Sequence, residues 1–142
     1  MQVQSYLFFE GRAEEAIQFY EKTLGAKVVM LMRYNQSPDP CPEGMIPPGS
    51  ENKVMHATIT IGETTVMLSD GRVSGKTNFD GFSLSLDFKD KQEAEKVFGA
   101  LLDGGEVGMP LGETFFAHSF GMVKDKFGMH WMVIVPREMP GQ

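Results

Sequence analysis

The sequence predicts an α+β protein built from two successive βαβββ modules. Two segments have the apolar spacing of amphipathic helices, and the segments between them have the alternating or apolar pattern of strands. The predicted helix starts lie near 12 and 90, 78 residues apart, and the helix ends lie near 25 and 104, 79 residues apart. These near-equal offsets indicate a structural duplication within a single domain, with one module in about 1–75 and the other in about 76–142.

The two helices are predicted over 12–24 and 91–103. Gly25 follows the first as its stop, and Asp90 with Glu93 forms a pair like a capping box before the second. The residues at helical spacing are Ala13, Ala16, Ile17, Tyr20 and Leu24 in the first, and Ala94, Val97, Phe98, Leu101 and Leu102 in the second.

Eight strands are predicted, at 3–9, 26–33, 54–61, 64–70, 81–88, 106–111, 114–124 and 130–135. The same order of elements would also describe a split ferredoxin-like fold. Residues 35–52 hold five prolines and two glycines, so they form neither a regular helix nor a central strand. This loop is either a lid or dimer arm, or a passive excursion.

Composition excludes several classes of protein. The net charge of −6 argues against a nucleic-acid partner, because an acidic surface repels phosphates. The longest apolar run is too short to span a membrane, and the N-terminus has no signal-peptide pattern. Cys41 is the only cysteine, which excludes an intrachain disulfide and suits a reducing cytoplasm. Cys41 itself is expected to be inert, because Asp39 and Glu43 lie nearby.

Several short stretches carry a family resemblance. They are Tyr6-Leu7-x-Phe9, Ala16-Ile17-x-Phe19-Tyr20, Leu24-Gly25-Ala26, Cys41-Pro42-x-Gly44-Met45, His56-Ala57, Met67-x-Ser69-Asp70, Ser74-Gly75-Lys76, Gly81-Phe82-x-Leu84-x-Leu86-Asp87, Glu113-Thr114-Phe115-x-Ala117-His118, Asp125-Lys126-Phe127-Gly128 and Trp131-Met132. Together they resemble the vicinal oxygen chelate superfamily of glyoxalase I, extradiol dioxygenases and bleomycin- or fosfomycin-resistance proteins. The most similar branch is PhnB-like, often labelled 3-demethylubiquinone-9 3-methyltransferase-like.

The resemblance implies half-open sheets around a cup, with the helices on the outer face. It also implies a homodimer, in which some members complete each cup across the interface. In metal-binding members, His, Glu or Gln ligands project into the cup from the first and last strand of each half. The matching positions here are Ser5, Met67, Gly81 and Met132, which do not hold a divalent ion. We therefore expect no metal at the usual site and no other cofactor; a displaced site would need His56, Glu113 and His118.

His56 is the first candidate for polar chemistry. Met55, Ala57, Ile59 and Ile61 form one apolar face of its strand, which leaves His56, Thr58 and Thr60 on the other face. His56 is therefore either a general base or ligand-binding donor, or a hydrogen-bonded strand histidine.

Glu113 and His118 are the second candidate. Being five apart, they lie on opposite faces of a regular strand, and only a bulge would bring them together. They form either a general-base pair or a buried structural ion pair. Asp70 is expected to cap a turn, and Gly71 to Lys76 makes a poor phosphate loop because no helix follows closely.

The expected cup wall and orienting groups complete the site. The substrate-binding candidates are Phe9, Met67, Ser69, Phe115, Phe116, His130 and Met132, and the catalytic candidates are His56, Glu113 and His118. Trp131 is expected in the core.

Three functions compete. The first is small-molecule binding without turnover. The second is metal-free acid–base catalysis by His56 or by the Glu113–His118 pair. The third is lyase, isomerase or dioxygenase chemistry at a displaced metal site. A methyltransferase label has little mechanistic support, because no strand leads into a Gly-rich turn and helix for a nucleotide-like methyl donor. The partners expected are a small molecule and a second copy of the chain, with no nucleic acid and no membrane.

Overall fold

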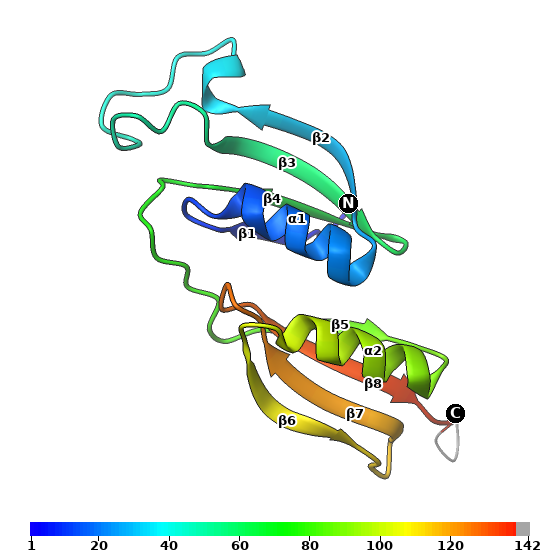
Figure 1. Ribbon diagram of the computed structural model, residues 1–142. Coiled ribbons are helices and arrows are strands. Elements are labelled where there is room, and N and C mark those ends of the chain that lie inside the picture. The colour runs from blue at the N-terminus through cyan, green and yellow to red at the C-terminus, as the bar shows by residue number, and fades with distance from the viewer. Residues whose placement is uncertain (139–142) are drawn as a thin grey trace. The chain divides into compact units, whose positions relative to one another are not determined.

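The first half of the chain forms a four-stranded sheet with one helix against it. The computed structural model describes residues 1–138, and its contacts divide the chain into two compact units, Met1–Asn78 and from Phe79 onward. The elements of the first unit are β1 (Tyr6–Phe8), α1 (Ala13–Leu24), β2 (Lys27–Arg33), a 3₁₀ turn at Tyr34–Gln36, β3 (Val54–Ile61) and β4 (Thr64–Ser69) (Figure 1). The strand order is β1-β4-β3-β2, with β1 and β4 parallel and the other pairs antiparallel.

The second unit repeats this arrangement. Its elements are β5 (Leu84–Asp87), α2 (Lys91–Leu102), β6 (Glu106–Gly112), β7 (Ala117–Lys124) and β8 (His130–Pro136), in the strand order β5-β8-β7-β6. Again the first and last strands of the unit pair in parallel. The prediction of two βαβββ modules is confirmed. The split ferredoxin-like alternative is wrong, because the eight strands form two separate sheets.

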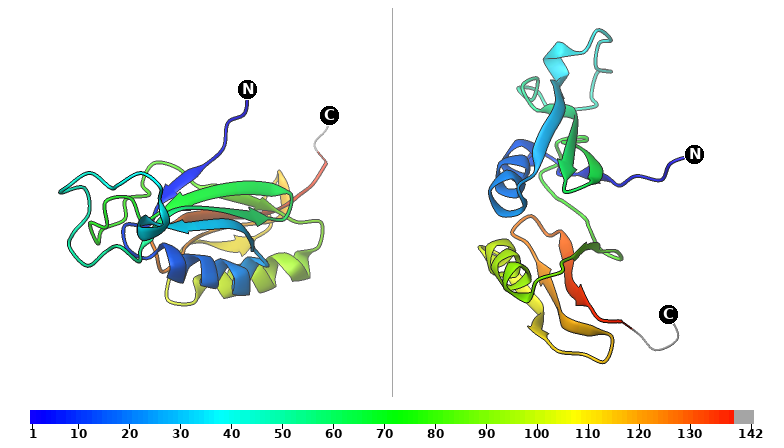
Figure 2. Two further views of the ribbon diagram at one scale, coloured as in Figure 1. Left: turned by 90° about the horizontal axis from the view of Figure 1, so that it is seen from above. Right: turned by 90° about the vertical axis from the view of Figure 1, so that its right-hand side faces the viewer.

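In the first unit, α1 covers one face of the sheet (Figure 2). The buried side chains on that side alternate along the strands, as at Ala57 and Ile59 of β3 and at Val66 and Leu68 of β4. The intervening residues therefore share the opposite face, which the helix of this unit, α1, leaves uncovered in the described residues. We call this the first open face; its members are Tyr6, Phe8, Met30, Met32, His56, Thr58 and Met67.

In the second unit, α2 covers Trp131, Val133 and Val123, which are all buried. A Cβ at position 121 would lie 2.9 Å from the Phe98 ring, so Gly121 permits the close approach of α2 to β7. The face opposite α2 is the second open face, and its members are Ser85, Phe120, Met122, Met132 and Ile134. Trp131 belongs to the core, as predicted.

Three predicted strands begin three residues later than expected, at Tyr6 instead of residue 3, at Leu84 instead of residue 81 and at Ala117 instead of residue 114. Gly81 has φ +87°, a left-handed conformation that favours glycine and interrupts an extended strand. Phe82 precedes β5, is 45% exposed and contacts Phe79 edge to face. Phe82 therefore does not take the helix-facing place that alternation with Leu84 and Leu86 would give it in the predicted strand 81–88.

A buried carboxylate organises the first unit. Asp70 is 1% exposed and follows β4 directly. Its Oδ1 accepts from the Gly11 and Ala13 amides at 2.9 and 2.8 Å, and its Oδ2 accepts from the Val54 amide at 2.8 Å. The carboxylate thus joins the β1–α1 loop, the first residue of α1 and the start of β3. The predicted role of Asp70, capping a local turn, understates this function.

A second buried carboxylate fixes the turn between β7 and β8. Asp125 is 3% exposed, and its Oδ1 accepts from the Phe127 and Met129 amides at 2.9 and 3.0 Å. Its Oδ2 accepts from Trp131 Nε1 at 2.9 Å. The Asp-x-Phe-Gly motif therefore ties the turn to the buried indole. Among residues 1–138, no helix has the length and apolar character needed to cross a membrane.

We predict that Asp70→Ala lowers the free energy of unfolding by about 3 kcal/mol or more, because each buried N–H that loses its acceptor costs about 1–3 kcal/mol. Urea unfolding followed by circular dichroism measures this loss. Asp39→Ala is the matched control, because Asp39 is an exposed aspartate of the 37–53 loop. A loss below about 1 kcal/mol in Asp70→Ala would contradict the role given to this carboxylate.

Candidate functional site

The first open face carries a hydrogen-bonded aromatic pair. The Tyr6 hydroxyl lies 2.7 Å from His56 Nδ1, and the two rings are 5.5 Å apart. On its other side, His56 Nε2 lies 3.3 Å from Thr58 Oγ1. Phe8 stands next to Tyr6 on β1, with the two ring centroids 5.1 Å apart. The strand pairing produces this arrangement, because β1 lies beside β4 and β4 lies beside β3.

The protonation of the pair follows from the acidity of its members. Burial raises the pKa of the Tyr6 phenol, and a hydrogen bond from Ser69 opposes the rise in part. The phenol is therefore protonated at neutral pH, and it is a stronger donor than a neutral imidazole N–H. We assign the Tyr6 O–H as donor to Nδ1, which places the imidazole hydrogen on Nε2, toward Thr58.

The surroundings of the pair are largely apolar. Met67 of β4 lies opposite both Tyr6 and Thr58 in the strand register, so it shares their face. Phe8 is 50% exposed and Tyr6 is 38% exposed, which leaves aromatic surface accessible on this face. Met67 therefore lies on the face where the sequence placed it.

Two predicted wall residues of the first unit lie on opposite faces of the sheet: Ser69 pairs with Phe8 and shares the face of Met67, whereas Phe9 lies on the helix side. Ser69 is buried at the end of β4, where its Oγ accepts from the Gly71 amide at 2.8 Å. Phe9 is fully buried and packs edge to face on Tyr20 of α1, with the ring centroids 6.2 Å apart. The prediction that Phe9 lines the open face is wrong, because Phe9 lies on the helix side of the sheet.

The register of β1 is displaced by one residue from the prediction. Tyr6, and not Ser5, lies opposite Met67. The predicted open-face position of this strand was Ser5, and neither Tyr6 nor Phe8 was among the predicted site residues. Tyr6-Leu7-Phe8-Phe9 is apolar at every position, so alternation alone does not show which of these side chains share a face.

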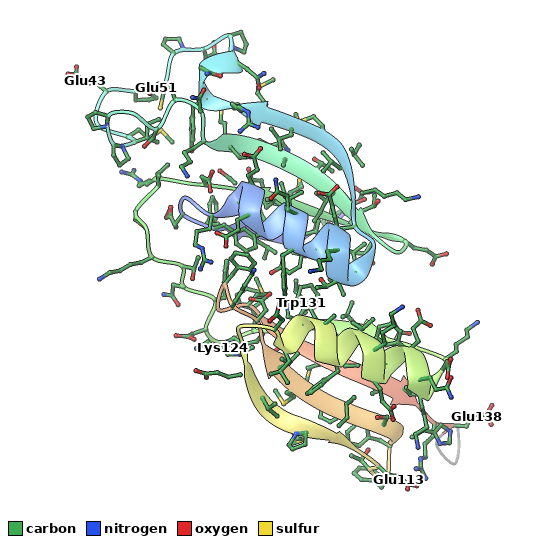
Figure 3. All side chains as sticks on the ribbon, viewed as in Figure 1. Glu43, Glu51, Glu113, Lys124, Trp131 and Glu138 are labelled. Atoms are coloured by element: carbon green, nitrogen blue, oxygen red, sulfur yellow. The ribbon has the colours of Figure 1, made fainter. Side chains whose placement is uncertain are left out.

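In the second unit, Glu113 and His118 do not form the predicted pair. The register of β7 shifts between Ala117 and Ser119, an irregularity at the position of His118. However, Glu113 Oε1 accepts a hydrogen bond from Arg137 Nη2 at 2.6 Å. Arg137 lowers the pKa of Glu113 through this bond and through its charge, while His118 contributes a smaller electrostatic lowering. The expectation of a buried Glu113–His118 ion pair is wrong, because the partner is Arg137 and Glu113 is exposed (Figure 3).

The other candidates of the second unit are spread over its sheet. Phe116 stacks edge to face on Phe120 of the second open face, with the centroids 5.2 Å apart, and Phe115 is 78% exposed in the loop before β7. Met132 lies opposite Met122 on the same face. His130 Nε2 lies 3.6 Å from Asp80 Oδ1. A cavity of about 300 Å³ has Met122, Lys124 and His130 among its lining residues.

A polar cavity of the first unit has no counterpart in the sequence analysis. Its volume is about 390 Å³, and Arg33, Lys53 and Glu14 are among its lining residues. Arg33 forms an ion pair with Glu14, and its Nη1 donates to the Asn52 carbonyl at 2.8 Å. Lys53 Nζ donates to the Gly11 carbonyl at 2.8 Å. These contacts join the base of the 37–53 loop to α1.

The residues that a displaced metal site would need are divided between the units. His56 belongs to the first, and Glu113 and His118 belong to the second. Within the part of the chain that the structure describes, no group of three or more His, Cys, Asp or Glu side chains is placed to hold a metal ion.

Comparison with solved structures places this fold in a known class. A glyoxylase/bleomycin resistance protein/dioxygenase domain from Frankia sp. EAN1pec is 15% identical to the chain, covers 96% of it and 95% of its own length, and superimposes with a TM-score of 0.67. Two βαβββ units with open faces therefore define a protein with the glyoxalase fold.

Closer relatives narrow the class to one family. The sequence profile of 3-demethylubiquinone-9 3-methyltransferase matches residues 1–134, and the chain belongs to this family. Protein PA1353 from Pseudomonas aeruginosa is 37% identical, with a TM-score of 0.81 over 97% of this chain and 99% of that protein. A PhnB protein from Bacillus cereus is 32% identical, with a TM-score of 0.77 over 95% of this chain and 99% of its own. The predicted resemblance to the PhnB-like branch is confirmed.

We predict that His56 carries its hydrogen on Nε2, because Tyr6 donates to Nδ1. The ¹⁵N shifts of the imidazole nitrogens at neutral pH distinguish the two tautomers. In Tyr6→Phe the tautomer preference is lost, whereas the nitrogens of His118 stay unchanged and provide the internal control. An imidazole with its hydrogen on Nδ1 in the unmodified protein would contradict the assignment.

We predict that the Glu113 carboxyl titrates below its ordinary value of about 4.5, because Arg137 stabilises the carboxylate. The stability from this pair is complete above that ordinary value and is lost as the pH falls through the lowered pKa of the folded state. A ¹³C titration of the Glu113 carboxyl measures the midpoint.

Arg137→Gln should raise that midpoint. Arg12→Gln, which removes an arginine paired with Glu15 in the first unit, should leave it unchanged. Equal midpoints in the unmodified protein and in Arg137→Gln would refute the pairing.

Proposed function

We propose that this protein binds an uncharged, largely apolar small molecule on the first open face, and that the Tyr6–His56 pair supplies the orienting hydrogen bond. The observation that carries the proposal is the 2.7 Å contact between the Tyr6 hydroxyl and His56 Nδ1, next to the half-exposed ring of Phe8. Small-molecule sites combine apolar and aromatic walls with a few placed polar groups.

The direction of the hydrogen bonds indicates what such a ligand offers. With Nδ1 occupied by Tyr6, the imidazole presents Nε2–H, whose contact to Thr58 Oγ1 is long at 3.3 Å. A carbonyl oxygen of a ligand is a better acceptor in reach of that hydrogen. The ligand is therefore a molecule with an apolar or aromatic body and a carbonyl-type acceptor.

The same geometry favours binding over acid–base catalysis. A general base needs a free lone pair, and the lone pair of the neutral His56 ring accepts from Tyr6. Burial raises the pKa of Tyr6, so very little of its phenolate, the form that could act as a base, is present at neutral pH. The pair is thus better suited to donating a hydrogen bond than to removing a proton.

The donor set also favours binding over metal chemistry on this face. His56 is joined there by a phenol, a threonine hydroxyl and the thioether of Met67. Divalent ions with catalytic roles are held by several imidazoles or carboxylates, and a thioether selects softer ions.

Methyl transfer, which the family name describes, gains no support from the helix termini. A nucleotide-like donor would place its charged groups on free amides at the start of a helix. In the first unit, the Gly11 and Ala13 amides already donate to Asp70.

The probe for this proposal is Prodan, a neutral naphthalene ketone whose emission shifts to the blue in apolar surroundings. We expect saturable binding at one site per chain, weakened about tenfold in Phe8→Ala and in His56→Ala, since tenfold corresponds to about 1.4 kcal/mol of lost contact. Fluorescence titration measures the dissociation constants.

Phe82→Ala is the matched control, because Phe82 is 45% exposed, close to the 50% of Phe8, but lies outside the first open face. It should bind Prodan as the unmodified protein does. Unsaturable emission, or equal affinities in Phe8→Ala and Phe82→Ala, would overturn the proposal.

A further inference from the structure

The loop after β4 has an unusual backbone conformation. Gly71, Val73 and Gly75 have φ values of +58°, +55° and +82°, while Arg72 and Ser74 between them have negative φ. A positive φ is costly for a β-branched residue such as Val73. Successive residues of alternating hand turn their amides toward one side, and the resulting concavity binds anions.

A carboxylate already lies in this concavity. Glu10 Oε2 accepts from the Arg72 amide at 3.0 Å and from the Ser74 amide at 3.5 Å. Glu10 itself has φ +54°, a conformation that side chains other than glycine rarely adopt. Two strained residues that are not glycine, Glu10 and Val73, are therefore brought together around one carboxylate.

Other contacts hold the loop in shape without this carboxylate. The Gly71 amide donates to Ser69 Oγ at 2.8 Å, and the Tyr34 hydroxyl donates to the Gly71 carbonyl. The Val73 amide donates to the Asp70 carbonyl at 2.9 Å. Only the Arg72 and Ser74 amides depend on the Glu10 carboxylate, so an anion that replaced it would meet a preformed pair of donors.

The loop is also accessible to an anion from solution. Arg72, Ser74 and Lys76 are exposed, and two of them are cations. At position 71, a Cβ would lie 2.8 Å from Glu10 Oε2 and 3.1 Å from the Phe8 ring, so only glycine fits there. The expectation that Gly71 to Lys76 makes a poor phosphate loop rested on the lack of a following helix, whereas here the loop backbone itself supplies the donors.

We propose that Gly71–Gly75 is an oxyanion-binding loop, and that the Glu10 carboxylate is its built-in competitor. A phosphate or carboxylate group binds by displacing the Glu10 side chain and accepting from the Arg72 and Ser74 amides. Arg72 and Lys76 add favourable charge. This site is separate from the Tyr6–His56 pair and stands or falls independently of the function proposed above.

The test is a titration with inorganic phosphate, followed by the ¹H–¹⁵N amide signals of the whole chain. Glu10→Gly removes the carboxylate and suits the positive φ at this position. We expect this variant to bind phosphate at least tenfold more tightly than the unmodified protein, with downfield shifts of the Arg72 and Ser74 amide protons. Glu43→Gly, which removes an exposed glutamate of the 37–53 loop, should match the unmodified protein (Figure 3).

A second variant keeps the test decisive if glycine loosens the loop. Glu10→Asn is uncharged, and asparagine tolerates positive φ better than most residues. The amide signals of β3 and β4 report whether the first unit remains folded. The proposal is overturned if Arg72 and Ser74 show no saturable shift in either folded variant, or if Glu43→Gly gains affinity to the same extent.

Discussion

The first unit depends on the buried carboxylate of Asp70. Its three backbone donors come from the β1–α1 loop, the first residue of α1 and the first residue of β3. Because Asp70 directly follows β4, this single group fixes where α1 begins relative to the sheet. The same position brings the 71–75 loop next to Glu10, and the adjoining β1–β4 pairing brings Tyr6 next to His56.

Local patterns were enough to predict the order and type of the elements, because each helix and most strands carry a clear period. They failed where the period is missing or where a partner is distant. Tyr6-Leu7-Phe8-Phe9 does not alternate between apolar and polar residues, so the sequence does not show which side chains face the helix. Pairing with β4 decides this. Glu113 has His118 nearby in sequence, yet its carboxylate meets Arg137, 24 residues away. Long-range ion pairs of this kind leave no trace in local spacing.

The chemistry that the first unit offers to a ligand depends on which hydrogen-bond donors and acceptors already have partners. Asp70 uses the amides at the start of α1, and Tyr6 uses the lone pair of His56. What remains for a ligand on the first open face is an imidazole N–H among aromatic and thioether groups. A hydrogen bond of this kind orients a neutral molecule, whereas the charge-binding amides lie beyond the end of β4, at Arg72 and Ser74.

Two hydrogen bonds hold the Glu10 carboxylate in the 71–75 loop. A residue forced into a left-handed conformation costs about 1–3 kcal/mol, and both Glu10 and Val73 have one. A hydrogen bond to a charged group contributes about 1.5–3 kcal/mol, and solvent exposure places these two bonds at the lower end of that range. An external oxyanion that displaced the carboxylate would make the same two bonds, while the Gly75 amide, which donates to the Glu10 carbonyl at 2.9 Å, would keep the Glu10 backbone beside the loop.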